Sequence, residues 1–196
     1  MKRGFDFICS LIGILILSPV FVVIWIWIKL ESEGPALFLQ TRVGKNNKDF
    51  KLYKFRTMYV NAEAKGQLTV GMRDPRITGA GYVLRKYKLD ELPQLFNVLE
   101  GTMSLVGPRP EVRKYVDMYT STQMQVLNVK PGITDLASIQ FINENELLAK
   151  AEHPEEYYIN EIMPAKLRIN MEYVHNRAFF KDLLLIFKTL SKIVSK

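Results

Sequence analysis

Two adjacent acidic residues, Asp90 and Glu91, have the type and surroundings needed for chemistry on phosphate. They follow a run of cations that includes Arg85 and Lys88, and they precede Pro93, a common residue in the first turn of a helix. Nearby cations and the free amides of a helix start keep a carboxylate ionised and help to bind phosphate. An ionised aspartate can attack phosphorus and form an acyl phosphate. A structural role also fits the pair, because Asp is a preferred helix N-cap and acidic residues suit the first turn.

Further cations suited to phosphate lie beside rigid or aromatic residues. They occur in the run Lys51 to Arg56 and in the run Gly107 to Pro110. Arginine offers a planar fork of donors, whereas lysine neutralises phosphate oxygens as a point charge. The sequence contains no Walker-type loop and no dinucleotide fingerprint. A pyrophosphate donor would therefore need side-chain cations and a hard metal such as Mg²⁺, for which Asp90 and Glu91 are the nearest oxygen ligands. A solvated basic face is the alternative interpretation.

The composition excludes several kinds of site. The chain has 196 residues, enough for one domain with a sizeable core. Its single cysteine, Cys9, excludes an intramolecular disulfide. With only His153 and His175 in addition, a structural zinc site and a serine-histidine or cysteine-histidine mechanism are disfavoured. The net charge of +7 favours phosphates, nucleic acid or an anionic membrane surface without choosing among them.

A long apolar segment precedes these motifs. Phe7 to Ile28 carries no charge, and as a helix it would cross a hydrocarbon core of about 30 Å. Basic residues flank both ends, and because basic flanks prefer the cytoplasm, both ends favour the same side. Ser18 and Pro19 lie in the middle, where a kink could return the helix to its own leaflet. Proline is also tolerated in spanning helices, so the residues alone leave both topologies open.

After Gly34 and Pro35 the chain becomes polar and basic, which marks the unit that must position the candidate site. A helix is expected after Pro93 and should end at Gly101, a usual residue just past a helix end. The stretch from Phe179 onward is amphipathic and basic, as in helices that either lie in the membrane interface or pack on a domain. The other expected elements are extended segments at Ala36–Gln40 and Asp49–Tyr53 and helices at Thr57–Lys65, Glu111–Gln125 and Pro154–Asn170, the last interrupted at Pro164.

Six segments, taken in order, resemble those of a known family. They are the apolar segment with Ser18 and Pro19, Lys54–Met58 (KFRTM), Asp74–Thr78 (DPRIT), Leu89–Gln94 (LDELPQ), Met103–Pro110 (MSLVGPRP) and Lys130–Thr134 (KPGIT). Together they resemble the bacterial sugar transferase family, the small monotopic phosphoglycosyl transferases that start glycan assembly on polyprenyl phosphate. The resemblance covers nearly the whole chain, and the shared order makes it specific.

The resemblance implies a mostly helical α+β fold in two parts. Residues 1–34 would form a re-entrant membrane hairpin, a helix-break-helix with its break at Ser18 and Pro19. Residues 35–196 would form a small cytoplasmic catalytic domain with short strands and interfacial amphipathic helices. The implied location is the bacterial inner membrane, with the catalytic domain on its cytoplasmic face and in contact with membrane lipids.

The resemblance also implies an Asp90 and Glu91 dyad, in which Asp90 is both nucleophile and Mg²⁺ ligand. Asp90 would attack the phosphate attached to the sugar of a UDP-sugar and expel UMP. Polyprenyl (undecaprenyl) phosphate would then take the phosphosugar, giving polyprenyl diphosphate sugar. The implied phosphate-binding residues are Arg109, Lys54, Arg56 and Arg85. This agrees with the reading of the residues, because phosphoryl transfer depends on positioning and on cations that neutralise oxygens.

Two segments depart from the family pattern. Thr102 occupies a position where many members carry an acidic residue, and residues 135–144 differ from the version common elsewhere. Because residues 135–144 differ, no sugar specificity is inferred from the family. The chain also lacks the extra membrane helices and accessory domain of longer relatives, so it is expected to be a minimal catalytic unit.

Two other classes of function compete with this interpretation. A non-catalytic membrane adaptor of a glycan-assembly complex is disfavoured, because Asp90, Glu91 and Arg109 are all present. A nucleic-acid binder rests on net charge alone and lacks a recognisable binding motif, so no nucleic-acid partner is expected. The sequence is compatible with a homo-oligomer.

Overall fold

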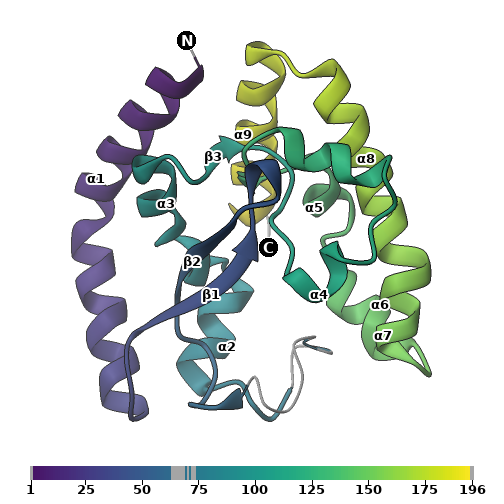
Figure 1. The fold of residues 1–196 in the computed structure, drawn as a ribbon. Helices are drawn as coiled ribbons and strands as arrows, with labels where there is room; N and C mark the ends of the chain where they lie inside the picture. Colours follow the sequence, from purple (N-terminus) through teal and green to yellow (C-terminus); the bar gives the residue numbers. More distant parts are fainter. Residues whose placement is uncertain (1, 63–68, 70, 72–73, 195–196) are drawn as a thin grey trace.

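The fold is a mostly helical α+β arrangement, as predicted. One long helix lies along a domain that contains the remaining helices and strands (Figure 1). The computed structural model describes residues 2–62, 69, 71 and 74–194. Within these residues, two small two-stranded sheets connect the helices. The helices are α1 Lys2–Glu31, α2 Gly79–Lys86, α3 Gln94–Glu100, α4 Arg113–Val116, α5 Leu136–Gln140, α6 Glu144–Lys150, α7 Pro154–Tyr157, α8 Met163–Asn176 and α9 Phe179–Val194, and the strands are β1 Leu37–Val43, β2 Asp49–Phe55, β3 Ser104–Val106 and β4 Gly132–Thr134.

The apolar segment forms one helix of 30 residues, α1. Pro19 lies inside it and has no amide proton to donate to the carbonyl oxygen of Leu15, four residues earlier. The hydroxyl of Ser18 donates to that same oxygen at 2.8 Å, so the carbonyl keeps a partner. The helix therefore runs through Ser18 and Pro19 without interruption. The break expected there is not seen, and the re-entrant topology stays a prediction.

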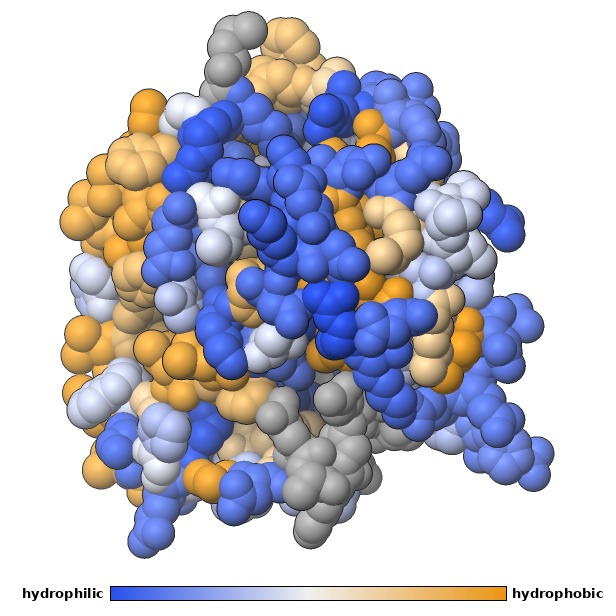
Figure 2. Space-filling view, viewed as in Figure 1, coloured by the Kyte–Doolittle hydropathy of each residue, from blue (hydrophilic) through white to orange (hydrophobic). Residues whose placement is uncertain are grey.

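The outward surface of α1 is apolar. Among the residues that the structure describes, α1 is the one helix long and apolar enough to cross a membrane. Side chains such as Leu15, Ile16 and Val23 are 64 to 70% exposed. Figure 2 shows apolar residues gathered along the edge of the molecule where α1 lies. An exposed apolar patch of this extent is typical of a surface that contacts lipid or another protein.

The start of α1 is bound to the domain by polar contacts. The guanidinium of Arg3 donates to the carbonyl oxygens of Val98 and Leu99, at 2.8 Å for Leu99, where α3 ends. The buried carboxylate of Asp6 accepts a hydrogen bond from the hydroxyl of Ser104 in β3 at 2.8 Å. These bonds satisfy backbone groups that a helix end leaves free and also neutralise part of the buried charge.

The end of α1 is bound to the same domain by different contacts. Ile24 and Ile28 are buried in a cluster that includes Phe55 of β2. The carboxylate of Glu31 accepts a hydrogen bond from the amide of Ala80, in the first turn of α2, at 2.8 Å. Since both of its ends contact one domain, α1 lies along that domain rather than projecting away from it.

The hairpin of β1 and β2 confirms the two predicted extended segments, each slightly longer than expected. The strands pair antiparallel, beginning with Leu37 opposite Phe55. The connecting turn places Asn46 and Asn47 at φ 57° and 59°, a backbone region that asparagine adopts more readily than most residues. The hairpin brings the cations of β2 toward α3, because the amide of Tyr53 donates to Oδ1 of Asn97 at 2.9 Å.

The parallel pair of β3 and β4 joins two of the motifs, MSLVGPRP and KPGIT. Ser104 lies opposite Gly132, and the amide of Gly132 donates to the carbonyl oxygen of Pro108 at 3.0 Å. The two backbones approach so closely that a Cβ on Gly132 would lie 2.1 Å from the amide nitrogen of Gly107. Glycine is therefore required at this crossing, which fixes the loop that carries Arg109.

The predicted helix at Thr57–Lys65 is wrong over its described part. Met58 forms an isolated bridge with Ile77, and the amide of Tyr59 donates to the carbonyl oxygen of Arg76 at 3.0 Å. The backbone here is extended because its hydrogen bonds go to a neighbouring segment and not to the next turn. The end of the range lies outside the described residues.

The predicted helix at Glu111–Gln125 is also wrong in extent. Only α4 is α-helical, and a 3₁₀ segment follows at Gln123–Asn128. Between them the amide of Thr120 donates to the side chain of Gln123 at 2.9 Å, while the Thr120 hydroxyl accepts from the Gln123 amide at 3.3 Å. Local bonds of this kind between side chain and backbone compete with a continuous helix.

The predicted helix end at Gly101 and the predicted helical region Pro154–Asn170 are confirmed, but the interruption expected at Pro164 is not, because Pro164 lies inside α8. α3 ends at Gly101, which has φ 92° and so adopts the left-handed conformation that glycine favours. The region Pro154–Asn170 is helical with a π-helical turn at Tyr158–Ile162, directly before the turn that contains Pro164.

The amphipathic C-terminal helix α9 packs on the domain, one of the two roles that its sequence left open, and keeps an exposed apolar side. Leu185 is buried against the domain, whereas Phe180 and Phe187 are 81% and 68% exposed. Lys2 forms an ion pair with Asp182, which connects the beginning of α9 to the beginning of α1. This ion pair holds α9, with its exposed apolar side, next to the apolar helix α1.

Replacing Gly132 by alanine is expected to destabilise the protein. The added Cβ would lie 2.1 Å from a backbone nitrogen, which cannot move aside without disturbing the pairing of β3 with β4. Overpacking of this kind lowers the free energy of unfolding by about 1–3 kcal/mol, visible as a lower Tm of the detergent-solubilised protein. Gly4→Ala is the control, because a Cβ there meets no atom within 4 Å. Equal Tm values for the two variants would contradict the assigned contact.

Candidate active site

The acidic pair lies in a 3₁₀ turn, Leu89–Glu91, between α2 and α3. The turn follows Lys88, which has φ 58°, and the N-cap of α3 is Pro93, with no side-chain capping bond. Asp90 therefore does not cap the helix. It is 6% exposed, and its Oδ1 atom is buried without a hydrogen-bond partner among the described residues. The structural explanation offered by the sequence, that this aspartate caps a helix, therefore does not apply.

Glu91 is held by a two-pronged ion pair with Arg109. Nη1 of Arg109 donates to Oε2 of Glu91 at 3.0 Å, and Nη2 donates to Oε1. Nζ of Lys54 lies 3.9 Å from the same Oε1 atom. Burial alone would raise the pKa of Glu91, but the charges of Arg109, Lys88 and Lys54 outweigh burial and hold that pKa well below its usual range. Glu91 is thus ionised and locked in position.

The pKa of Asp90 is shifted in the opposite direction. Burial, and then the negative charge of Glu91, raise the pKa of Asp90, while Lys54, Lys88 and Arg85 act to lower it. Neighbouring carboxylates whose environments drive their pKa values apart are typical of acid or nucleophile assignments. Here one carboxylate orients a cation, and the other has an oxygen free to bond to a ligand.

Lys54 contributes a cation that is easily lost. It lies on β2, and its side chain is 16% exposed. Burial lowers the pKa of Lys54 to about 8, with Arg109 and Arg42 acting in the same direction and Glu91 opposing them. An ammonium group at this position would neutralise phosphate oxygens, but above its pKa the neutral amine has no charge to offer.

Arg85 and Arg56 are placed differently. Arg85 is in the last turn of α2, where its Nε donates to the hydroxyl of Thr57 at 2.8 Å and its charge acts on Asp90. Arg56 is buried and donates instead to the carbonyl oxygens of Ser32, at 2.8 Å, and Glu33, in the turn after α1. The structure therefore brings Asp90, Glu91, Lys54, Arg85 and Arg109 into one electrostatic site and directs Arg56 elsewhere, so that its phosphate-binding role stays a prediction.

A metal ion would find one carboxylate here. Among the described residues, no group of three or more His, Cys, Asp or Glu side chains forms a metal cluster. Mg²⁺ is commonly held by one or two carboxylates together with substrate phosphates and water. The unpartnered oxygen of Asp90 fits that mode, whereas Glu91 is committed to Arg109. The donor set therefore suits Mg²⁺ that arrives with a diphosphate.

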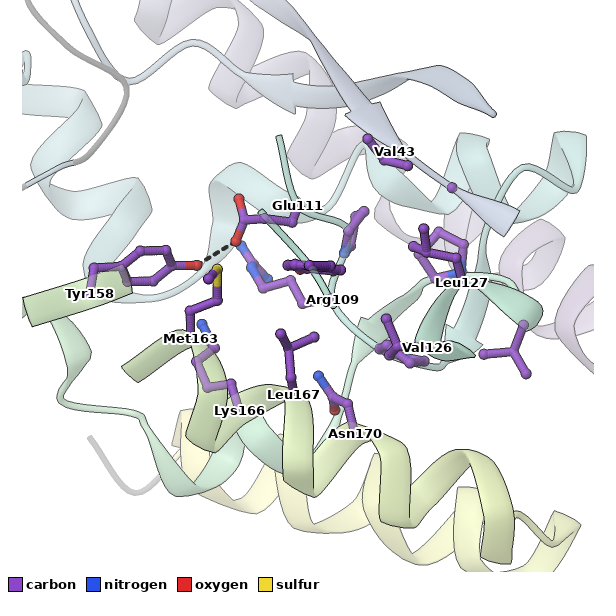
Figure 3. Close-up of a pocket in the computed structure, with 16 residues that line it drawn as sticks. Val43, Arg109, Glu111, Val126, Leu127, Tyr158, Met163, Lys166, Leu167 and Asn170 are labelled. Atoms are coloured by element: carbon purple, nitrogen blue, oxygen red, sulfur yellow. Dashed lines mark hydrogen bonds between the residues drawn. The ribbon is translucent and has the colours of Figure 1, made fainter. Parts of the chain in front are cut away.

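Sequence reasoning missed the contacts that hold Arg109 in place. Next to it, the carboxylate of Glu111 accepts from Arg42 at 2.9 Å and from the hydroxyl of Tyr158 (Figure 3). Burial would raise the pKa of Glu111, but the charge of Arg42 and the bond from Tyr158 keep it low. The sequence signal was weak, because an acidic residue directly after GPRP points to no partner that lies far away in the chain.

A long apolar helix bound to a domain that holds an acidic pair among several cations has the features of a membrane-associated protein with a charged site. The chain belongs to the bacterial sugar transferase family, whose model matches residues 1–196.

Three relatives illustrate the range of this family. The UDP-N-acetylgalactosamine-undecaprenyl-phosphate N-acetylgalactosaminephosphotransferase of Aeromonas hydrophila is 39% identical over 100% of this chain and 44% of its own length. The UDP-glucose:undecaprenyl-phosphate glucose-1-phosphate transferase of Escherichia coli (strain K12) is 36% identical over 98% of this chain and 40% of its own length. Exopolysaccharide production protein ExoY of Rhizobium meliloti (strain 1021) is 32% identical over 98% of this chain and 84% of its own length. The chain thus spans less than half the length of the first two relatives.

The pH dependence of turnover is expected to report Lys54. Because burial lowers its pKa to about 8, the protonated form is lost as pH rises through that value, and kcat/KM for a reaction at this site on a phosphate substrate should fall there. Lys54→Arg keeps its charge at these pH values and should move the alkaline fall to higher pH. Lys51→Arg, an exposed change on the same strand, should leave the profile unchanged. An identical alkaline limb in the wild type and Lys54→Arg would exclude this role.

Proposed function

We propose that the protein is a phosphoglycosyl transferase that moves a phosphosugar from a UDP-sugar to polyprenyl (undecaprenyl) phosphate. The observation that carries the proposal is the buried, unpartnered oxygen of Asp90 beside the Glu91–Arg109 ion pair. Relatives named for transfer of sugar phosphates to undecaprenyl phosphate support it. The products would be polyprenyl diphosphate sugar and UMP, in the first membrane step of glycan assembly.

The reaction would proceed by two displacements at one phosphorus atom. A carboxylate oxygen of Asp90 bonds to the phosphorus that carries the sugar, and the bond from that phosphorus to the bridging oxygen breaks, so UMP leaves with the electron pair. An oxygen of the carrier phosphate then bonds to the same phosphorus. The bond to Asp90 breaks in this second step, which restores the carboxylate.

The cations of the site would bind the oxygens on which charge develops. Arg109 has donor groups in a rigid fork, and its position is fixed by Glu91 on one side and by the β3–β4 crossing on the other. Lys54 and Arg85 add further positive charge that acts on Asp90. Positioning and charge neutralisation supply most of the catalysis in phosphoryl transfer.

Mg²⁺, when bound at Asp90 with the donor diphosphate, would neutralise phosphate charge and lower the pKa of the carboxylate. The protein's own part is to present the unpartnered oxygen and to exclude water around it. Asp90 is 6% exposed, so little solvent reaches the reacting oxygen.

The contacts at the two ends of α1 support a proposal for the location. The two ends of α1 contact the same domain through Arg3 and Glu31, so both ends and the domain would lie on one side of the bilayer. With its apolar surface and that of α9 in lipid, the protein would lie in the cytoplasmic leaflet of the bacterial inner membrane. Residues 1–34 would form the membrane part, and residues 35–196 the catalytic domain.

Asp90→Asn is expected to abolish turnover and leave the fold intact. An amide has nearly the same size but no nucleophilic charge, and no hydrogen bond to Oδ1 is lost. Release of UMP from UDP-sugars by detergent-solubilised protein with undecaprenyl phosphate and Mg²⁺ measures the reaction. Asp117→Asn, at a side chain that is 62% exposed, is the matched control and should keep wild-type activity. Full activity in Asp90→Asn would refute the nucleophile, and no UMP from wild-type protein with any donor would refute the function.

Tags at the two ends of the chain are expected to be on the cytoplasmic side together. The reason is that Arg3 and Glu31, near opposite ends of α1, both bind the catalytic domain. Protease or cysteine-label access in inverted and right-side-out membrane vesicles measures the orientation. Protection of only one tag in either kind of vesicle would mean that α1 spans the bilayer.

A further inference from the structure

A small cavity lies directly beside the candidate site. Its volume is about 40 Å³, and Arg109 forms part of its wall (Figure 3). Apolar side chains line most of it, among them Val126, Val129, Met163 and Leu167. At about 10–15 Å³ for one water, the space holds about three water-sized groups. A whole pyrimidine base or sugar ring is too large for it, whereas a short ring substituent is not.

One polar atom in this cavity lacks a partner. Asn170, on α8, is 5% exposed, and its Oδ1 oxygen is buried without a hydrogen-bond donor among the described residues. Figure 3 shows its side chain directed from α8 toward the cavity. A buried acceptor without a donor is rare in native proteins because it loses the hydrogen bond it made with water. A ligand that donates a hydrogen bond at this point would explain it.

Apart from Arg109, the charged side chains that line the cavity, Glu111 and Lys166, are already paired. Glu111 accepts from Arg42 and Tyr158, and Lys166 forms an ion pair with Glu144 at 2.7 Å. The ligand group is therefore neutral, mostly apolar and equipped with one hydrogen-bond donor. An acetamido group has this chemistry, since its N–H can donate to Asn170 and its methyl group can contact the apolar wall.

The position of the cavity agrees with that group. Arg109 contacts both the cavity and Glu91, and it is the residue proposed to bind the phosphate on C1 of the sugar. The substituent on C2 is the ring substituent nearest to that phosphate. A C2 group would therefore point toward the space on the far side of Arg109.

We propose that this cavity selects donor sugars that carry a 2-acetamido group, with Asn170 as the residue that recognises its N–H. The inference rests on the proposed function and adds the class of sugar. Family membership does not decide the matter, because the relative from Aeromonas hydrophila is named for N-acetylgalactosamine and the one from Escherichia coli for glucose.

Matched pairs of donors test the proposal: UDP-N-acetylgalactosamine with UDP-galactose, and UDP-N-acetylglucosamine with UDP-glucose. UMP release by the full chain in detergent, with undecaprenyl phosphate and Mg²⁺, gives kcat/KM for each donor. We expect the wild type to favour the acetamido member of at least one pair by about tenfold or more. Asn170→Leu should lower kcat/KM for the acetamido donor by about tenfold and leave that for the hydroxyl donor nearly unchanged.

Two further variants keep the test specific. Asn176→Leu, an exposed change near the end of the same helix, should alter neither donor. Leu167→Phe narrows the cavity from a position one turn earlier on α8 and should reproduce the selective loss. Because Oδ1 of Asn170 has no protein partner, the Tm of Asn170→Leu should be no lower than that of the wild type, in contrast to the loss expected from a purely structural asparagine.

The outcomes separate this inference from the proposed function. If no donor gives UMP, the proposed function fails. If UMP is released but the wild type treats both members of each pair equally, the cavity does not select the C2 group. Equal losses for both donors in Asn170→Leu would assign the cavity to the nucleotide or the carrier and would also overturn the inference.

Discussion

The partly buried ion pair of Glu91 and Arg109 is the interaction on which the site depends. An isolated charge in a protein interior is strongly unfavourable, and a pair is tolerated when its geometry is good and its remaining polar atoms are satisfied. Here each terminal nitrogen of the guanidinium donates to one carboxylate oxygen, so the two charges neutralise each other. Because Arg109 pairs with Glu91, Asp90 is the carboxylate that keeps an unpartnered oxygen.

The surrounding backbone explains why the pair can form at all. Arg109 follows β3, and the crossing of Gly107 with Gly132 leaves no freedom in the direction in which its loop leaves the sheet. In the same strand, the hydroxyl of Ser104 donates a hydrogen bond to the buried carboxylate of Asp6 in α1. Both α1 and the candidate site therefore depend on β3, because contacts from α1 help to position the strand that precedes Arg109.

The sequence predicted those parts of the fold that depend on local patterns. The apolar helix, the β1–β2 hairpin and the helix end at Gly101 follow from periodicity and turn residues, and the Asp90 and Glu91 pair was recognisable as a motif. Contacts between distant segments were not predictable in this way. The sequence did not show that Arg56 donates to the carbonyl oxygens of the turn after α1. The free oxygen of Asn170 could be recognised only once the cavity around it was formed.

The ion pair of Lys2 with Asp182 has a consequence for how the protein is made. These residues are 180 positions apart, so the ribosome must synthesise nearly the whole chain before the amine meets its carboxylate. During that time the apolar helix α1 has already been synthesised. Closing so long a loop carries an entropic cost, which contacts between α1 and the domain reduce by restricting where the late segment has to search. The first helix of the chain therefore serves as a surface on which the last helix completes the fold.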